Sequence, residues 1–185
     1  MTGGHFYLFC YYEHMKQLAV IRDQDFFPDK HLIDNSNYRT RDAARAVLLD
    51  SKGGIFLLNV SVHGYHKLPG GGVDDGESIK DALMRELMEE VGCKAEIVTE
   101  LGTILEYRDD EQLTQTSYCF LARQVGEQAP SSLEKGELEE GMFEVKANSL
   151  DEAIATLEQD QPDNVEGKFI QKRDLCILRA AKSPT

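Results

Sequence analysis

The sequence lacks several features that mark familiar classes of protein. It has no tryptophan, no apolar run long enough to cross a membrane and no two cysteines close together in the chain. The missing apolar run predicts a protein without a membrane-spanning segment. The scattered cysteines favour free thiols in a reducing cytosol over disulfides or a structural zinc site.

The chain also lacks an excess of basic residues. Its 33 acidic and 20 basic side chains give a net charge of −13. A general nucleic-acid binder carries a basic stripe, and none is evident here, so we expect no nucleic-acid partner. This acidic surface would repel a polyanionic substrate unless cations intervene. A phosphate-containing substrate would therefore need a metal ion or a local group of arginine and lysine side chains.

The size of the chain predicts one domain. Its 185 residues, 41% of them hydrophobic, can bury one core but are few for two. The apolar segment Phe6–Tyr12 lacks the basic flank and small-residue cleavage site of a signal peptide. A more ordinary sequence follows a second methionine, Met15. We expect residues 1–14 to be an extension and residues 15–185 to form a single cytoplasmic domain.

Strand-like and helix-like patterns follow one another along the chain. Ala43–Asp50 and Ile55–Val60 flank a glycine-containing turn, which predicts a hairpin. Residues 124–140 are polar and acidic and favour a flexible loop. Strands, a helix, strands and helices in this order predict an α/β fold on one core. The other predicted strands are Lys16–Ile21, Ala95–Tyr107, Thr114–Arg123 and Met142–Ala147, and the predicted helices are 78–91, 149–157 and 166–181.

The segment Ser78–Val91 has the period of an amphipathic helix, because apolar residues recur every four positions. Ser78 is a suitable N-cap, and Gly92 is placed to end the helix. The apolar stripe consists of Ile79, Leu83, Leu87 and Val91.

Three glutamates crowd the second half of this helix. Glu86, Glu89 and Glu90 have the spacing that puts side chains on one face, beside the apolar stripe. Like charges so placed destabilise a helix and raise each other's pKa. Mg²⁺ would relieve this repulsion, since it prefers oxygen ligands and bridges carboxylates to phosphates. The preceding glycines, 70–72, allow close backbone approach to a ligand. Together the two features predict a site for a metal ion and a phosphate chain.

The same stretch resembles the Nudix box, whose pattern is G-x5-E-x7-R-E-U-x-E-E-x-G-U, where U is a bulky apolar residue. Every glycine and charged position of that pattern is present, and Cys93 at the last apolar position is a mild departure. The flanking segments RAVLLD, IFLLNV and FEVKANSLDEAI are also similar to the family. The matching residues are Gly71, Glu77, Arg85, Glu86, Leu87, Glu89, Glu90, Gly92 and Cys93.

This MutT-like resemblance implies a Nudix-type α/β/α sandwich with a mixed β-sheet. It implies a hydrolase, dependent on Mg²⁺ or Mn²⁺, that cleaves a pyrophosphate bond in a nucleoside triphosphate or another nucleoside diphosphate derivative. Glu77 and Arg85 would pair and brace the loop against the helix. The implied metal ligands are the Gly70 carbonyl and the carboxylates of Glu86, Glu89 and Glu90.

The resemblance leaves the general base open. Some members of the family use a glutamate of the box, which here is Glu89 or Glu90. Others use a glutamate on a loop outside it, and Glu137, Glu139 and Glu140 occupy such a loop. Among these three loop glutamates, we expect Glu140 to be the base.

The substrate-binding residues are less well defined than the box. Arg45 and Lys67 could meet a phosphate, and Tyr107 could stack on a base. The alternative to an enzyme is a nucleotide-binding or regulatory module without turnover, although such proteins usually lose one of the box glutamates. Members of the family are often dimers, so a homodimer is a further expectation.

Overall fold

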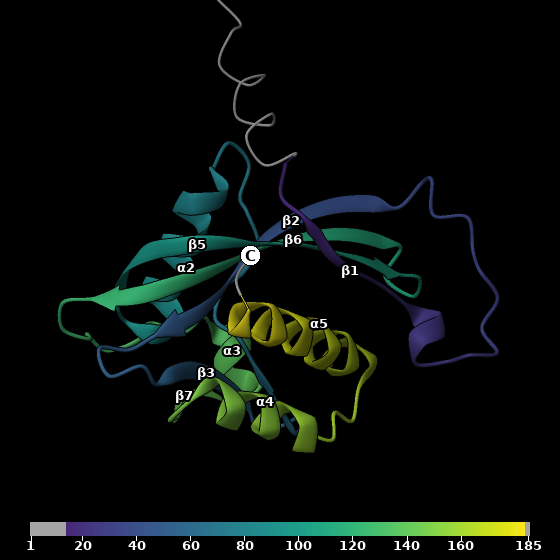
Figure 1. Cartoon of the computed structure of the whole chain (residues 1–185). Coiled ribbons are helices and arrows are strands. Elements are labelled where there is room, and N and C mark those ends of the chain that lie inside the picture. Colours follow the sequence, from purple (N-terminus) through teal and green to yellow (C-terminus); the bar gives the residue numbers. More distant parts are fainter. Residues whose placement is uncertain (1–13, 184–185) are drawn as a thin grey trace, which may run out of the picture.

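A computed structural model describes residues 14–183 and is built on one sheet (Figure 1). The sheet has seven strands in the order β1-β5-β6-β2-β3-β4, and β7 pairs with β3. The pairs β1–β5 and β2–β6 are parallel, and the other pairs are antiparallel. The strands are β1 (Gln17–Arg22), β2 (Arg39–Leu49), β3 (Ile55–Val60), β4 (Tyr65–Lys67), β5 (Lys94–Arg108), β6 (Leu113–Val125) and β7 (Met142–Ala147).

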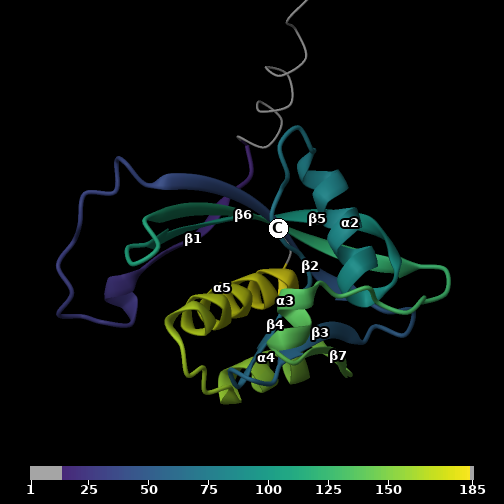
Figure 2. The same cartoon turned by 180° about the vertical axis from the view of Figure 1, so that it is seen from behind.

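Helices cover both faces of the sheet. Helix α2 (Ile79–Val91) packs against one face, and α4 (Leu150–Gln159) and α5 (Val165–Lys182) cover the other (Figures 1 and 2). Strand β3 is buried on both sides, because Phe56 belongs to the core under α2 and its neighbours Ile55 and Leu57 to the core under α5. This arrangement is the predicted α/β/α sandwich.

The helix ends follow the sequence signals. The Ser78 hydroxyl accepts a hydrogen bond from the Asp81 amide at 3.1 Å, which satisfies one free donor at the start of α2. Gly92 ends that helix in the left-handed conformation, with φ of 71°. Ser149 caps α4 by accepting from the Glu152 amide at 3.2 Å. Short polar side chains therefore set where these helices begin.

The predicted loop between residues 124 and 140 is wrong in two places. Strand β6 continues to Val125, and a short helix, α3 (Lys135–Glu139), occupies the end of the segment. The predicted hairpin of β2 and β3 is present only at its turn, where Leu49 pairs with Ile55. Beyond that point β3 pairs with β4, while β2 bonds the loop at Pro69 and Gly71. The two strands therefore separate because other backbone segments take up the hydrogen bonds that a longer hairpin would use.

Three further expectations concern the N-terminal extension, the cysteines and membrane-spanning segments. The extension expected at residues 1–14 lies outside the described residues except for His14. Within the described part, Cys93, Cys119 and Cys176 are free thiols. No helix between residues 14 and 183 is both long enough and apolar enough to cross a membrane.

Candidate functional site

The glycine loop runs alongside β2 in close backbone contact. The Ala44 amide donates to the Gly71 carbonyl at 2.9 Å, and the Ala46 amide donates to the Pro69 carbonyl at 3.1 Å. Gly70 has φ of 127°, and a Cβ there would lie 2.1 Å from the Ala44 carbonyl oxygen. Only glycine satisfies both the torsion and the approach. The contact fixes the loop at the head of the site.

Two buried carboxylates hold the same loop from opposite sides. The Leu68 amide donates to Asp174 Oδ2 at 2.7 Å, and the Gly70 amide donates to Glu90 Oε2 at 2.6 Å. The second oxygen of Glu90 lies 2.9 Å from Lys67 Nζ, and this glutamate side chain is 1% exposed. Glu90 of α2 and Asp174 of α5 therefore tie the loop to the helices on both faces of the sheet.

Arg85 connects the loop to the acidic face of α2. Its Nε and Nη2 donate to the two oxygens of Glu77, each at 3.0 Å, and Nη2 also donates to the Gly72 carbonyl at 3.0 Å. Nη1 donates to Glu86 at 2.9 Å and to Glu89 at 3.2 Å. The structure thus brings Glu77 and Arg85 together in the paired arrangement that the resemblance implies.

Glu86 lies directly against the glycine loop. A Cβ on Gly71 would lie 2.1 Å from Glu86 Oε1, so the missing side chain leaves the space that this carboxylate occupies. Burial raises the pKa of Glu86, the negative charge of Glu90 raises it further, and Arg85 opposes both. The charge of Glu90 therefore disfavours the charged form of Glu86, and a cation beside Glu86 would relieve this repulsion.

The side chains of the box supply oxygen donors of the kind that Mg²⁺ and Mn²⁺ bind. Glu86 and Glu89 direct their carboxylates at Arg85, and Glu90 directs its own at Lys67 and the Gly70 amide. In this arrangement no three acidic, histidine or cysteine side chains among residues 14–183 gather closely enough to hold a metal ion. The oxygen donors of the box fit a hard cation in kind, and the absence of a side chain at Gly71 lets Glu86 lie against the loop.

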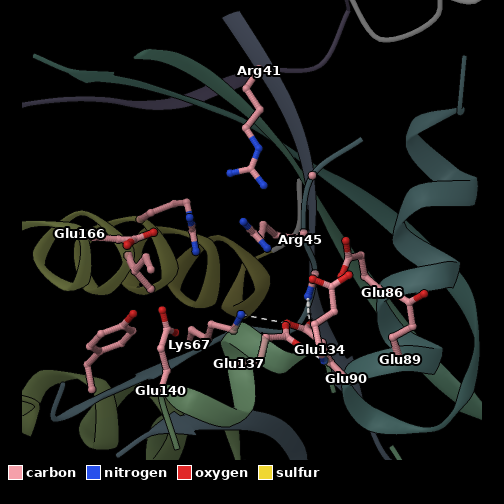
Figure 3. Close-up of a pocket in the computed structure, with 16 residues that line it drawn as sticks. Arg41, Arg45, Lys67, Glu86, Glu89, Glu90, Glu134, Glu137, Glu140 and Glu166 are labelled. Carbon is pink, nitrogen blue, oxygen red and sulfur yellow. Dashed lines mark hydrogen bonds and ion pairs between the residues drawn. The ribbon is translucent and has the colours of Figure 1, made fainter. Parts of the chain in front are cut away.

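A cavity of about 220 Å³ opens beside the box (Figure 3). Helix α2 contributes Glu86, Glu89 and Glu90 on one side, and β2 contributes Arg41 and Arg45 on another. The other lining residues come from β4, the glycine loop, the segment around α3, and α5: Tyr65, Lys67, Gly70, Gly71, Gly72, Glu134, Glu137, Glu140, Glu166, Ile170 and Arg173.

The glutamates around α3 divide between two ends of the cavity. Burial raises the pKa of Glu137, and the charges of Glu90 and Glu86 raise it further. Glu137 is therefore close enough to the box glutamates to interact with their charges. Glu140 instead acts on Tyr65, whose pKa is raised by burial, by Glu166 and by Glu140. Glu139 is exposed, and its carboxylate lies 3.4 Å from Lys135 Nζ.

The structure places two of the three expected substrate-binding residues in the cavity. Arg45 and Lys67 line it, whereas Tyr107 is absent from its lining. The Tyr107 ring lies under the guanidinium of Arg22, 4.0 Å from the ring centre, between β1 and β6. The position expected to stack on a base is therefore part of the sheet, away from the site.

Sequence reasoning missed Arg173, which reaches the cavity from α5. Its signal is its position in the helix, because Arg173 and Asp174 fall on the buried stripe of α5 and are 1% and 0% exposed. Charged residues are almost never fully buried unless paired, so a charged pair at core positions marks a special environment.

The comparisons with known proteins agree with this geometry. A family model described as NUDIX domain matches residues 39–166, about two thirds of the chain. This chain belongs to the Nudix family. The match covers every residue that lines the cavity except Ile170 and Arg173. It confirms the resemblance that rested on the box and its flanking segments.

A curated relative and two solved structures show the Nudix match in more detail. The RNA pyrophosphohydrolase of Wolbachia sp. subsp. Brugia malayi is 33% identical over 89 residues, 47% of this chain and 54% of that protein. The chain therefore matches about half the length of this relative. A MutT protein from Methanosarcina mazei Go1 is 17% identical with a TM-score of 0.51, covering 80% of this chain and 98% of the other. A NUDIX hydrolase from Nitrosomonas europaea is 18% identical with a TM-score of 0.53, covering 74% and 88%. These structures support the Nudix fold.

Proposed function

We propose that this protein is a metal-dependent hydrolase that cleaves a pyrophosphate bond in a nucleoside diphosphate linked to another moiety. The observation that carries this proposal is the glutamate triad of α2, which borders a cavity beside a glycine loop fixed by β2 and Glu90. The relative named RNA pyrophosphohydrolase supports the same type of bond cleavage. The net charge of −13 favours a small nucleotide over RNA as the substrate.

Mg²⁺ or Mn²⁺ is the proposed cofactor. Its ligands would be the Gly70 carbonyl and the carboxylates of Glu86, Glu89 and Glu90, all of which line the cavity. When bound, the ion would neutralise charge on the phosphates and acidify a water molecule. It would also remove the repulsion that raises the pKa of Glu86.

Glu137 is our preferred proton acceptor outside the box. Water attacks one phosphorus atom, the bridging P–O bond breaks, and the proton of the water passes to a carboxylate. The raised pKa of Glu137 suits this role, because a base works best when its pKa approaches the working pH. Glu140, the residue preferred from the sequence, also lines the cavity but stands beside Tyr65. Glu89 and Glu90 stay as candidates within the box.

The proposal also covers the domain bounds, the cellular location and the oligomeric state. Residues 15–185 would form the catalytic domain, and residues 1–14 an extension. Met15 packs against the core under α2, which supports this boundary. A cytoplasmic location and a homodimer stay predictions.

The test is a hydrolysis assay on the full chain with a panel of substrates. The panel contains a nucleoside triphosphate, a nucleotide sugar, ADP-ribose and an RNA with a 5′-triphosphate, each with Mg²⁺, Mn²⁺ or excess EDTA. We expect turnover that requires the metal and falls about 100-fold or more in Glu89→Gln and Glu90→Gln, since metal stabilisation of charge is worth several kcal/mol. Glu96→Gln, an exposed acid on β5, is the matched control and should keep native activity.

Two results would overturn the proposal. Activity that persists in EDTA would exclude the metal mechanism. Tight binding of one compound without turnover of any, by native and variant proteins alike, would favour the regulatory module.

A further inference from the structure

Arg45 is a buried cation without an acidic partner. It is 7% exposed. Among residues 14–183, no carboxylate oxygen pairs with its guanidinium within 4.0 Å, and its buried Nε has no hydrogen-bond partner. Burial lowers the pKa of Arg45 to about 10, and the charge of Arg173 lowers it further, while the more distant carboxylates of Asp174 and Glu90 oppose this shift. A buried charge without a directly paired acid is costly, so the free protein is destabilised at this position.

Two further guanidinium groups face the same cavity. Arg173 bonds Asp174 through Nε at 2.7 Å and its Nη1 lies 3.8 Å from Glu106, but its buried Nη2 has no hydrogen-bond partner among the described residues. Arg41 donates to a neutral amide, the Gln115 side chain, at 3.2 Å. Figure 3 shows Arg41 and Arg45 directed into the cavity from β2, across from Glu86. Two unpartnered N–H donors, from Arg45 and Arg173, and the guanidinium group of Arg41 thus line the same cavity.

Two other cations, Lys67 and Arg108, have closer acidic partners than Arg45. Lys67 also lines the cavity, but Glu90 neutralises it at 2.9 Å. Arg108 has a buried Nε without a partner, yet it pairs with Glu106 at 3.0 Å and Glu111 at 3.2 Å. Arg45 differs because, among the described residues, its guanidinium has no carboxylate within ion-pair distance and its Nε has no acceptor.

We propose that Arg45, with Arg41 and Arg173, forms a subsite for a phosphate group of the substrate that lies outside the cleaved bond. The claim that the bound phosphate belongs to a substrate rests on the proposed hydrolase function. The claim that an anion binds here rests on the cavity alone. A metal held by the box carboxylates would neutralise the scissile diphosphate, so the unpartnered N–H donors of Arg45 and Arg173, with Arg41 beside them, are left for another anion. Guanidinium groups bind phosphate through paired N–H bonds. The preferred substrate is therefore a nucleotide with three or more phosphates rather than a nucleotide sugar.

Binding of inorganic phosphate without metal tests the subsite directly. Thermal unfolding and calorimetry are run on the full chain in EDTA, with sodium chloride at matched ionic strength. We expect saturable phosphate binding that raises the Tm of the native protein. Arg45→Met should raise the Tm without phosphate and weaken phosphate binding roughly 10- to 100-fold, the value of hydrogen bonds to charged groups. Arg45→Lys, which keeps the charge but not the paired bonds, should fall between the two.

The control for charge is Arg123→Gln, an exposed arginine on β6. It removes the same charge and should keep the native phosphate response. Equal phosphate binding by native protein and Arg45→Met would overturn the subsite, as would no binding by the native protein.

Kinetics with paired substrates test the assigned class. For Arg45→Met, kcat/KM should fall roughly 10- to 100-fold for a nucleoside triphosphate and stay within about threefold for a nucleotide sugar of the same base. An equal loss on both would overturn the class. Phosphate binding that depends on Arg45, without turnover of any substrate, would refute the hydrolase and keep the subsite. Metal-dependent turnover with phosphate binding that is independent of Arg45 would keep the hydrolase and refute the subsite.

Discussion

Two groups of charged side chains flank the glycine loop, and the pKa of the central glutamate is shifted in opposite directions in the two groups. The group under α5 is built around Glu106, which is 0% exposed and accepts bonds from Arg108 at 3.0 Å and Gln115 at 2.7 Å. Burial alone would raise the pKa of Glu106, but Arg173 and Arg108 outweigh it and hold that pKa below its usual range. The group on α2 contains Glu86, whose pKa is instead raised by burial and by Glu90.

The difference separates charges that are compensated within the protein from charges that are only partly compensated. Under α5, Glu106 meets two guanidinium groups and an amide, so its charge is compensated within the protein. On α2, three glutamates share Arg85 and Lys67. Both groups reach the loop, through Asp174 at Leu68 and Glu90 at Gly70. We infer that the compensated group under α5 holds the glycine loop in position, and that the partly compensated group on α2 acts on a ligand beside that loop.

Breaking the compensated group should have the largest effect on stability. Glu106→Gln leaves two buried arginines short of an acid, which should lower the free energy of unfolding by about 3–5 kcal/mol. Because the folded pKa of Glu106 is depressed, its contribution is complete above the unfolded pKa and is lost as the pH falls through the folded one. Urea unfolding at neutral and acidic pH measures both effects.

The control for that experiment is Glu96→Gln, on the exposed side of the same strand, which should change stability by less than about 0.5 kcal/mol. A loss below about 1 kcal/mol in Glu106→Gln would contradict the structural role.

Two neighbouring glycines test the partly compensated group on α2. In Gly71→Ala, the new Cβ would meet only the end of the Glu86 side chain, which can move. We expect kcat/KM to fall about 100-fold through the displaced carboxylate, with the free energy of unfolding changed by about 1 kcal/mol or less. In Gly70→Ala the Cβ would strike the Ala44 carbonyl at a positive φ, so stability should fall as well. Similar stability losses in both variants would contradict the distinction.

The brace between the loop and α2 should have a smaller effect. A double-mutant cycle with Glu77→Gln and Arg85→Met should give a coupling energy of about 1–2 kcal/mol, because the pair is bidentate but partly exposed. The exposed pair Lys135–Glu139 on α3 is the matched control, with an expected coupling of about 0.5 kcal/mol or less. Equal coupling in the two pairs would show that the brace adds nothing beyond an ordinary surface contact.

The smallest expected effect, in the native protein, is a shift of the pH profile. If Glu137 is the base, kcat/KM falls as the pH drops through its pKa, which is raised by burial and by Glu90 and Glu86. The acid limb should therefore lie above the usual range of a glutamate, and Glu137→Gln should abolish that limb with most of the activity. Glu140→Gln is the comparison variant. A limb that survives in Glu137→Gln and disappears in Glu140→Gln would restore the assignment made from the sequence.

Much of the fold follows from local pattern. Ile55–Val60 and Met142–Ala147 are strands at the predicted residues, and Ser78 and Gly92 bound α2 as predicted. Alternation, capping and helix termination depend on residues a few positions apart, so the sequence displays them directly. The segment around α3 was mispredicted because its five-residue helix is too short to show a helical period.

The sequence by itself determined the Nudix box, since its spacing places Glu86, Glu89 and Glu90 on one face of one helix. Only the tertiary structure decided what lies opposite. Parallel pairing of β2 with β6 and packing of α5 on the sheet bring Arg173 to the cavity beside Arg45, 128 positions earlier in the chain, and leave Tyr107 outside it. Such contacts depend on long-range packing of the core, for which a linear pattern carries no signal beyond burial.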